Sequence, residues 1–145
     1  MSIDAQYKLG KDYELISNPL PVKKDGIVEV TEIFWYGCGG CYSFEPLVNS
    51  WKEDLPDYVN FSKMPVTWGP IHQLHASLFY TIEALELNSS IHSAVFITIH
   101  KDGNMLTSQE SIVKFLSKSG IEPETAEKYL NSFSIKQKVT RDLQT

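Results

Sequence analysis

The sequence lacks several features that would mark particular classes of protein. It has no internal repeat, no low-complexity stretch and no apolar run long enough to span a bilayer. Its 13 basic residues are dispersed and are outnumbered by 18 acidic ones, which gives a net charge of −5. Because nucleic-acid-binding proteins normally carry a basic patch, this charge distribution argues against that class. Cysteine is also scarce, with two residues in a chain of 145.

Apolar residues, by contrast, make up 42% of the chain, and aromatic residues are plentiful. This composition argues against disorder and predicts one sizeable core. The segment from Met1 to Asp4 leads into polar sequence and shows no signal peptide. Such a start is typical of a cytosolic protein, and the mature form of an exported protein would look the same.

The two cysteines, Cys38 and Cys41, stand where a strand-like pattern changes to a helix-like one. Residues 27–35 are β-branched and aromatic, which predicts a strand. After it, apolar residues recur every three or four positions, which predicts a helix. Its buried face is expected to hold Cys41, Phe44, Leu47, Val48, Trp51 and Leu55. Its exposed face is expected to hold Ser43, Glu45, Asn49, Lys52 and Glu53.

A CxxC pair between a strand and a helix is typical of redox-active cysteines and favours that interpretation here. A helix N-terminus offers partial positive charge and unpaired N–H groups, both of which stabilise a thiolate. The thiolate is the nucleophile in thiol–disulfide exchange. We therefore expect Cys38, at the helix start, to be the nucleophile and Cys41, one turn further on the apolar face, to be the resolving thiol.

Three other interpretations of the cysteines remain open. A structural disulfide across so short a loop would remove little chain entropy and would stabilise weakly. A zinc site could add His72 and His75, although their spacing is tighter than usual and there is no second CxxC. The two residues could also be inert buried thiols, because cysteine is among the most buried residue types.

The rest of the chain predicts two further strands and a helical block. The strands are expected at residues 13–16 and 58–66, and the helical pattern begins after Trp68-Gly69-Pro70. Five helices follow, within residues 71–85, 91–99, 108–120, 123–133 and 134–143. Their expected end signals are Ser108 and Ser134 as N-caps, Gly120 as a left-handed stop and Pro123 in a first turn, with Phe133 buried.

The histidines are expected to be structural. His75 lies near the apolar stripe of its helix, which favours a hydrogen-bonded core histidine. His72 and His92 are expected to be exposed or capping residues.

Several stretches together resemble the DsbA-type thiol:disulfide oxidoreductases of Gram-negative bacteria, and the resemblance runs from about Ala5 to the C-terminus. They are Ala5-Gln6-Tyr7, Gly10-Lys11-Asp12-Tyr13, Val28–Cys38 and Cys41–Pro46. The resemblance implies an α/β, thioredoxin-like fold with an inserted helical domain. Residues 1–67 would be the first part of the thioredoxin-like domain, 68–134 the inserted domain, and 135–145 the start of the return helix.

The resemblance also implies an activity and the residues that carry it. Cys38 matches the exposed attacking cysteine and Cys41 the buried resolving one. Glu32 matches the acidic residue beneath the active site that helps to move protons to and from the buried thiol, although it could be an ordinary exposed strand glutamate. No cofactor is implied. The implied partners are newly exported proteins with free cysteines and a quinone-linked membrane protein, and the implied compartment is the periplasm.

Two departures from the family pattern qualify these expectations. The family archetype carries Pro-His between its cysteines, whereas this chain carries Gly39-Gly40, which predicts a weaker oxidant. The family also continues beyond Thr145 into a cis-proline loop, two strands and a terminal helix. Without them the strand at 27–35 would have an open edge, which predicts dimerisation through that edge or completion by a longer polypeptide. Because of this second departure, another function stays open: the chain could be a non-catalytic binding or assembly fragment.

Overall fold

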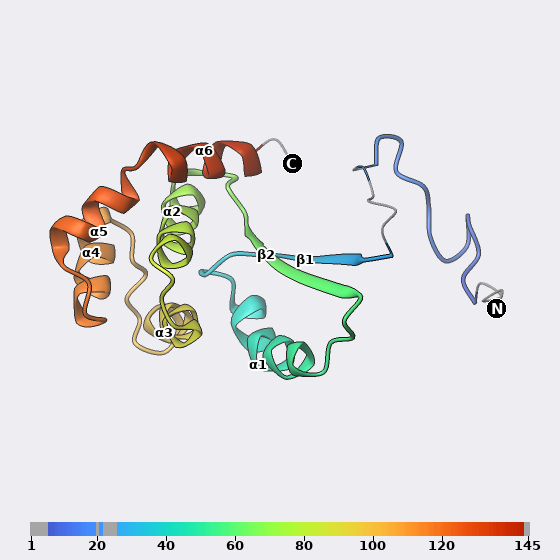
Figure 1. Ribbon diagram of the computed structural model, residues 1–145, viewed down its shortest axis with the longest axis horizontal. Helices are drawn as coiled ribbons and strands as arrows, with labels where there is room; N and C mark the ends of the chain where they lie inside the picture. Colours follow the sequence, from blue (N-terminus) through green and yellow to red (C-terminus); the bar gives the residue numbers. More distant parts are fainter. Residues whose placement is uncertain (1–5, 20, 22–25, 144–145) are drawn as a thin grey trace.

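A computed structural model of the chain describes residues 6–19, 21 and 26–143 (Figure 1). Two strands and an intervening helix come first: β1 (Val28–Phe34), α1 (Gly39–Glu53) and β2 (Val59–Pro65). Five helices follow, α2 (Pro70–Ala84), α3 (Ser89–His100), α4 (Gln109–Lys118), α5 (Pro123–Leu130) and α6 (Phe133–Asp142). In the part of the chain that is described, no helix is both long and apolar enough to cross a membrane.

The strands form a parallel pair, in register from Val28 opposite Val59 to Phe34 opposite Pro65. A parallel pair needs a crossover connection, and α1 supplies it. The cysteine pair therefore lies just beyond the carboxyl end of β1. Figure 1 shows α2–α6 gathered beyond the carboxyl ends of both strands, on the same side as the cysteines.

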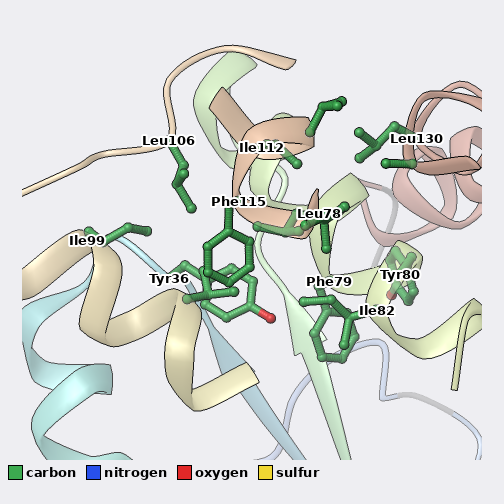
Figure 2. Close-up of a cluster of buried hydrophobic side chains, with 14 of the residues drawn as sticks. Tyr36, Leu78, Phe79, Tyr80, Ile82, Ile99, Leu106, Ile112, Phe115 and Leu130 are labelled. Carbon is green, nitrogen blue, oxygen red and sulfur yellow. The ribbon is translucent and has the colours of Figure 1, made fainter. Parts of the chain in front are cut away.

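The main core lies among these helices, and the chain just before the cysteines inserts into it (Figure 2). Phe34 and Tyr36, from the end of β1 and the turn after it, are 1% and 0% exposed. They belong to one buried cluster that includes side chains from all five helices, among them Leu78, Phe79, Phe96, Ile99, Ile112, Leu116, Leu130 and Ile135. The helical block thus fixes one side of the cysteine turn.

Most elements lie where the sequence predicts them, and the end signals largely hold. Ser108 caps α4 through the backbone N–H of Ser111, and Gly120 has a φ of +90°. Ser132, not Ser134, caps α6, because α5 already ends at Leu130. Phe133, expected inside, is 75% exposed for the same reason: it begins α6 instead of continuing α5.

The prediction of a strand at residues 13–16 is wrong. Tyr13 forms a single bridge with Leu9, closing a turn in which the N–H of Gly10 donates to the Tyr13 carbonyl. Leu15 and Ile16 are each 75% exposed, and in the described part of the chain no strand lies beside them to pair with.

The prediction of which residues of α1 are buried and which are exposed is also partly wrong. Val48 is buried, but Phe44, Leu47 and Trp51 are 53%, 64% and 44% exposed. Glu45, assigned to the exposed face, is 5% exposed. The cause is that α1 turns the side bearing Cys41, Glu45 and Val48 inward, while the described sheet ends at β1 and leaves the other apolar side uncovered. The proposed division at residues 67 and 134 stays a prediction.

Candidate active site

The cysteine turn is built by the start of α1. Cys38 is the N-cap of the helix, and its Sγ accepts a hydrogen bond from the backbone N–H of Cys41 at 3.2 Å. The N–H of Cys38 in turn donates to the carbonyl of Trp35 at 3.0 Å, which closes the turn. Both cysteines are free thiols and both are partly buried. Cys38 therefore occupies the one position of the helix whose side chain faces its unpaired N–H groups.

The two thiols have opposite electrostatic environments. The hydrogen bond from the Cys41 thiol, followed by those from the backbone N–H groups of Cys41 and Gly40, lowers the pKa of Cys38. Burial raises the pKa of Cys41, and its hydrogen bond to Cys38 adds to the rise. A helix N-terminus stabilises the anion of the capping group, whereas burial disfavours any anion. The site therefore favours one thiolate, on Cys38.

Trp35 is held beside the turn by His75. The indole Nε1 donates to Nδ1 of His75 at 3.0 Å, and Nε2 of His75 lies 3.1 and 3.2 Å from the carbonyl oxygens of Met105 and Leu106. Since carbonyls only accept, Nε2 carries the proton, and burial lowers the pKa of this histidine. The indole lies so close to Gly37 that a Cβ there would meet it at 2.3 Å.

These contacts decide two expectations. The prediction that His75 is a hydrogen-bonded core residue is confirmed. The geometry gives no support to the zinc alternative, because both nitrogens of His75 are already bonded within the protein. In the described ranges of the chain, no three His, Cys, Asp or Glu side chains gather as metal ligands.

Tyr36 is held by two histidines of α3. Its backbone carbonyl accepts from Nε2 of His100 at 2.7 Å, and its hydroxyl lies 2.8 Å from Nδ1 of His92. Burial raises the pKa of the Tyr36 phenol, so the hydroxyl keeps its proton. The expectation that His92 is exposed or capping is wrong: its side chain is 12% exposed and faces the turn.

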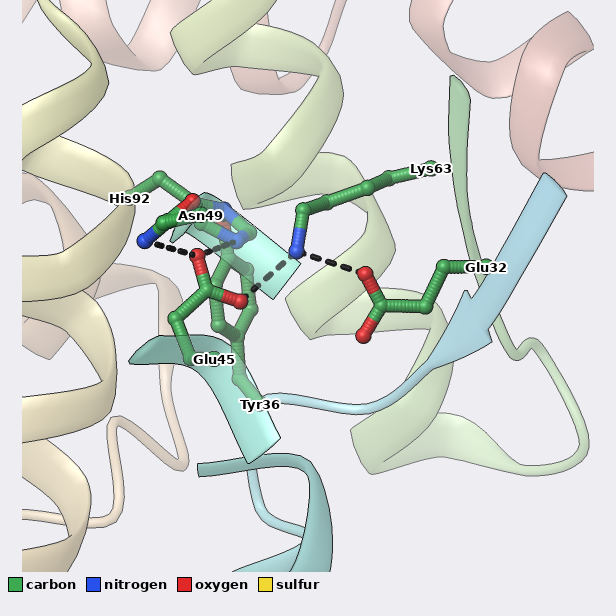
Figure 3. Close-up of polar contacts among 6 residues, drawn as sticks. All are labelled: Glu32, Tyr36, Glu45, Asn49, Lys63 and His92. Carbon is green, nitrogen blue, oxygen red and sulfur yellow. Dashed lines mark hydrogen bonds and ion pairs between the residues drawn. The ribbon is translucent and has the colours of Figure 1, made fainter. Parts of the chain in front are cut away.

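A buried charge cluster lies beneath the turn (Figure 3). Nζ of Lys63, on β2, is 2.7 Å from carboxylate oxygens of both Glu32 and Glu45. The second oxygen of Glu45 lies 3.3 Å from the amide nitrogen of Asn49 and 3.5 Å from Nε2 of His92. Burial alone would raise the pKa of Glu45, but hydrogen bonds and charge from His92 and Lys63 outweigh it and lower the pKa to about 2.

Glu32 lies inside this cluster, with a side chain that is 13% exposed. The alternative of an ordinary exposed strand glutamate is therefore wrong. Its negative charge also contributes to the raised pKa of Cys41, as expected of a carboxylate near that thiol. The structure thus places Cys38 and Cys41 in one turn and Glu32 close enough to Cys41 to affect its pKa, while the catalytic roles predicted for these three residues stay predictions.

The sequence alone did not predict that Lys63, Glu45 and His92 belong to the site. Lys63 stands opposite Glu32 in the strand register, but that register cannot be read from either strand alone. Glu45 did carry a signal, since it follows Cys41 by four positions and so shares its helical face. His92 carried no such signal, because its partners are far away in the sequence.

The chain is similar to several thiol:disulfide interchange proteins. No protein-family model matches it. It is 38% identical over 137 residues to the thiol:disulfide interchange protein DsbA of Azotobacter vinelandii, covering 94% of this chain and 64% of that protein. It is 41% identical over 130 residues to DsbA of Pseudomonas aeruginosa, covering 90% and 62%. The chain thus spans less than two thirds of the length of these curated relatives.

A solved structure extends the likeness to the fold. The crystal structure of Pseudomonas aeruginosa DsbA superposes with a TM-score of 0.84 at 38% identity, covering 95% of this chain and 72% of that one. This agreement confirms the expected α/β, thioredoxin-like fold. The chain belongs to the DsbA family of thiol:disulfide interchange proteins.

Proposed function

We propose that this protein is a thiol:disulfide oxidoreductase that passes a disulfide from Cys38 and Cys41 to cysteines of other proteins. The observation that carries the proposal is the unequal pair of thiols: the pKa of Cys38 is lowered at the start of α1, and that of Cys41 is raised by burial. Membership of the DsbA family supports the same activity.

The reaction transfers two electrons from a substrate dithiol to the protein disulfide. A substrate thiolate attacks Sγ of Cys38, the Cys38–Cys41 bond breaks, and Cys41 departs as a thiolate that takes up a proton. The second substrate thiolate then attacks the substrate sulfur of the mixed disulfide, and Cys38 departs as a thiolate. Departure of Cys38 is favoured by its lowered pKa, because a more acidic thiol leaves faster.

Glu32 is proposed to donate the proton that Cys41 gains and to accept the proton that Cys41 loses. Cys41 has the raised pKa of the pair, so its thiolate must be protonated as it leaves and deprotonated when the disulfide forms again. A nearby carboxylate can carry that proton as a general acid or base. Glu32→Gln is therefore expected to slow turnover while the protein remains folded.

The substrates are proposed to be newly exported proteins with free cysteines, and the compartment the periplasm. A further protein partner, proposed to be a quinone-linked membrane protein, would restore the Cys38–Cys41 disulfide after each cycle. These proposals rest on the family resemblance. No cofactor is needed for the transfer itself, because both electrons move between sulfur atoms.

Two assays test the activity together. Insulin reduction measures exchange with a protein disulfide, and a glutathione titration measures whether Cys38 and Cys41 form a reversible disulfide. We expect both to respond in the wild type and in neither Cys38→Ser nor Cys41→Ser. A wild type that neither forms the disulfide nor accelerates insulin reduction would contradict the proposal.

A second candidate function, assembly through the sheet edge, is favoured by one region. In the described part of the chain β1 has no strand partner other than β2, and beside it lies an apolar groove of about 500 Å³. Its lining includes Val30, Phe44, Leu47, Trp51 and Phe61. An open edge flanked by apolar side chains is a template for pairing with another chain. Light scattering is expected to show a dimer, and a stable monomer with cooperative thermal unfolding would contradict this candidate.

A further inference from the structure

We propose that His92 is a positioning residue for the cysteine site: from α3, its imidazole holds the residues on both sides of the Cys38–Cys41 turn. One nitrogen lies 2.8 Å from the hydroxyl of Tyr36, two residues before Cys38. The other lies 3.5 Å from the carboxylate of Glu45, four residues after Cys41 (Figure 3). The link from the imidazole to the cysteine chemistry depends on the function proposed above.

Aromatic side chains fix the orientation of the imidazole. The rings of Phe34, Phe79 and Phe96 contact it edge to face, with centroids 5.3, 6.0 and 5.4 Å away. Nδ1 is within hydrogen-bond distance of the Tyr36 hydroxyl, whereas the buried Nε2 faces the Glu45 carboxylate across 3.5 Å, an ion-pair distance without a hydrogen bond.

The charge count shows what His92 adds to the cluster. Two carboxylates, Glu32 and Glu45, share the single ammonium of Lys63, and all three side chains are nearly inaccessible to water. The imidazole of His92 gives Glu45 a second polar neighbour, 3.5 Å from its carboxylate. Buried charges are tolerated only when they are paired, so this balance matters more here than it would at the surface.

The groups that face His92 come from every element packed around it. They are Glu45 on α1, Glu83 on α2, Lys63 on β2 and Tyr36 in the turn before α1. Glu45 is the carboxylate of this set whose contact with the imidazole is 3.5 Å, so its titration reports most directly on the loss of His92.

His92 connects to the thiols through Tyr36. Its imidazole lies 2.8 Å from the Tyr36 hydroxyl, and Tyr36 leads into the turn in which the backbone N–H of Cys41 donates to Sγ of Cys38 at 3.2 Å. That hydrogen bond is among the contacts that lower the pKa of Cys38. Loss of His92 should therefore loosen the turn and weaken the stabilisation of the Cys38 thiolate.

Two substitutions separate the parts of this role. His92→Gln keeps a donor and an acceptor but cannot carry the charge, whereas His92→Phe keeps the ring packing and loses both polar contacts. His100→Gln is the matched control, since His100 lies on the same helix but bonds the backbone carbonyl of Tyr36 and stacks on Tyr42 instead of facing Glu45. Two readouts are needed: an NMR titration of the Glu45 carboxyl, and the alkylation rate of Cys38 in the reduced protein at mildly acidic pH.

In both His92 variants we expect the proton affinity of Glu45 to rise about tenfold or more, equivalent to one pKa unit. We expect alkylation of Cys38 to slow roughly threefold in His92→Gln, equivalent to half a pKa unit. His100→Gln should leave the Glu45 titration unchanged.

If His92→Phe does not fold, His92→Gln alone decides. An unchanged Glu45 titration in His92→Gln overturns the proposal, and so does a shifted titration with an unchanged Cys38 rate. Neither readout needs disulfide exchange, so a wild type inactive toward insulin would refute the proposed function without deciding this inference.

Discussion

The two sides of the cysteine turn differ in how completely this chain covers them. Toward the helices, Phe34 and Tyr36 are fully enclosed and three histidines hold the segment before Cys38. Toward the open side of α1, Phe44, Leu47 and Trp51 remain exposed. The difference indicates that the helical block sets the geometry of the thiols, while the described residues leave the other side of α1 uncovered.

The largest expected effect on the closed side comes from Lys63→Met. The substitution leaves two buried carboxylates without their shared cation, and breaking a buried pair in this way typically costs about 3–5 kcal/mol. Urea unfolding at neutral pH measures the loss. Lys114→Met, at an exposed position of α4, is the control and should change stability by no more than about 0.5 kcal/mol. Equal stabilities for the two variants would show that the cluster does not form.

A pair of leucines compares the two sides directly. Leu116→Ala removes a fully buried side chain from α4 and should destabilise the protein by about 2–5 kcal/mol. Leu47→Ala, on the open side of α1, should cost no more than about 0.5 kcal/mol. Thermal and urea unfolding give both values. If Leu47→Ala proves as costly as Leu116→Ala, the open side is covered in solution, and light scattering would then show whether a second copy covers it.

Glu45 gives the closed side a pH dependence. Its folded-state pKa of about 2 lies below the ordinary value of 4.5, so its ionised form contributes stability above about pH 4.5. That contribution, about 3 kcal/mol, is lost as pH falls from there through pH 2. The difference in unfolding free energy between wild type and Glu45→Gln isolates it from other carboxylates. A difference that stays constant over this range would contradict the assignment.

A smaller effect is expected at the turn itself, where Gly39 and Gly40 separate the cysteines. A Cβ at Gly39 meets nothing within 4 Å, and one at Gly40 meets Sγ of Cys38 at 3.7 Å, so both positions accept a side chain. Because neither residue between the cysteines carries a cation, we expect a reduction potential more reducing than the roughly −120 mV of a strongly oxidising DsbA. Replacing Gly39-Gly40 with Pro-His should make it more oxidising by roughly 30 mV, or about 1.4 kcal/mol. A wild-type potential already near −120 mV would refute this.

The sequence predicted what depends on local pattern. The CxxC turn, the two strands, the helix order and the Ser108 cap all follow from periodicity and end signals within a few residues. The buried face of α1 did not, because apolar residues occupy two of its sides and only the tertiary structure decides which side packs inward. The charge cluster was unpredictable for a related reason: Lys63 meets partners 31 and 18 residues away, through a strand register and a helix rotation that neither segment specifies.

The most direct test of this account is the relative reactivity of the two thiols. The reduced protein would be treated with an alkylating agent at mildly acidic pH, and the labelling of Cys38 and Cys41 followed separately by mass spectrometry. Because the cap lowers the pKa of Cys38 and burial raises that of Cys41, we predict that Cys38 is labelled far faster. Equal rates at the two residues, or faster labelling of Cys41, would contradict the account.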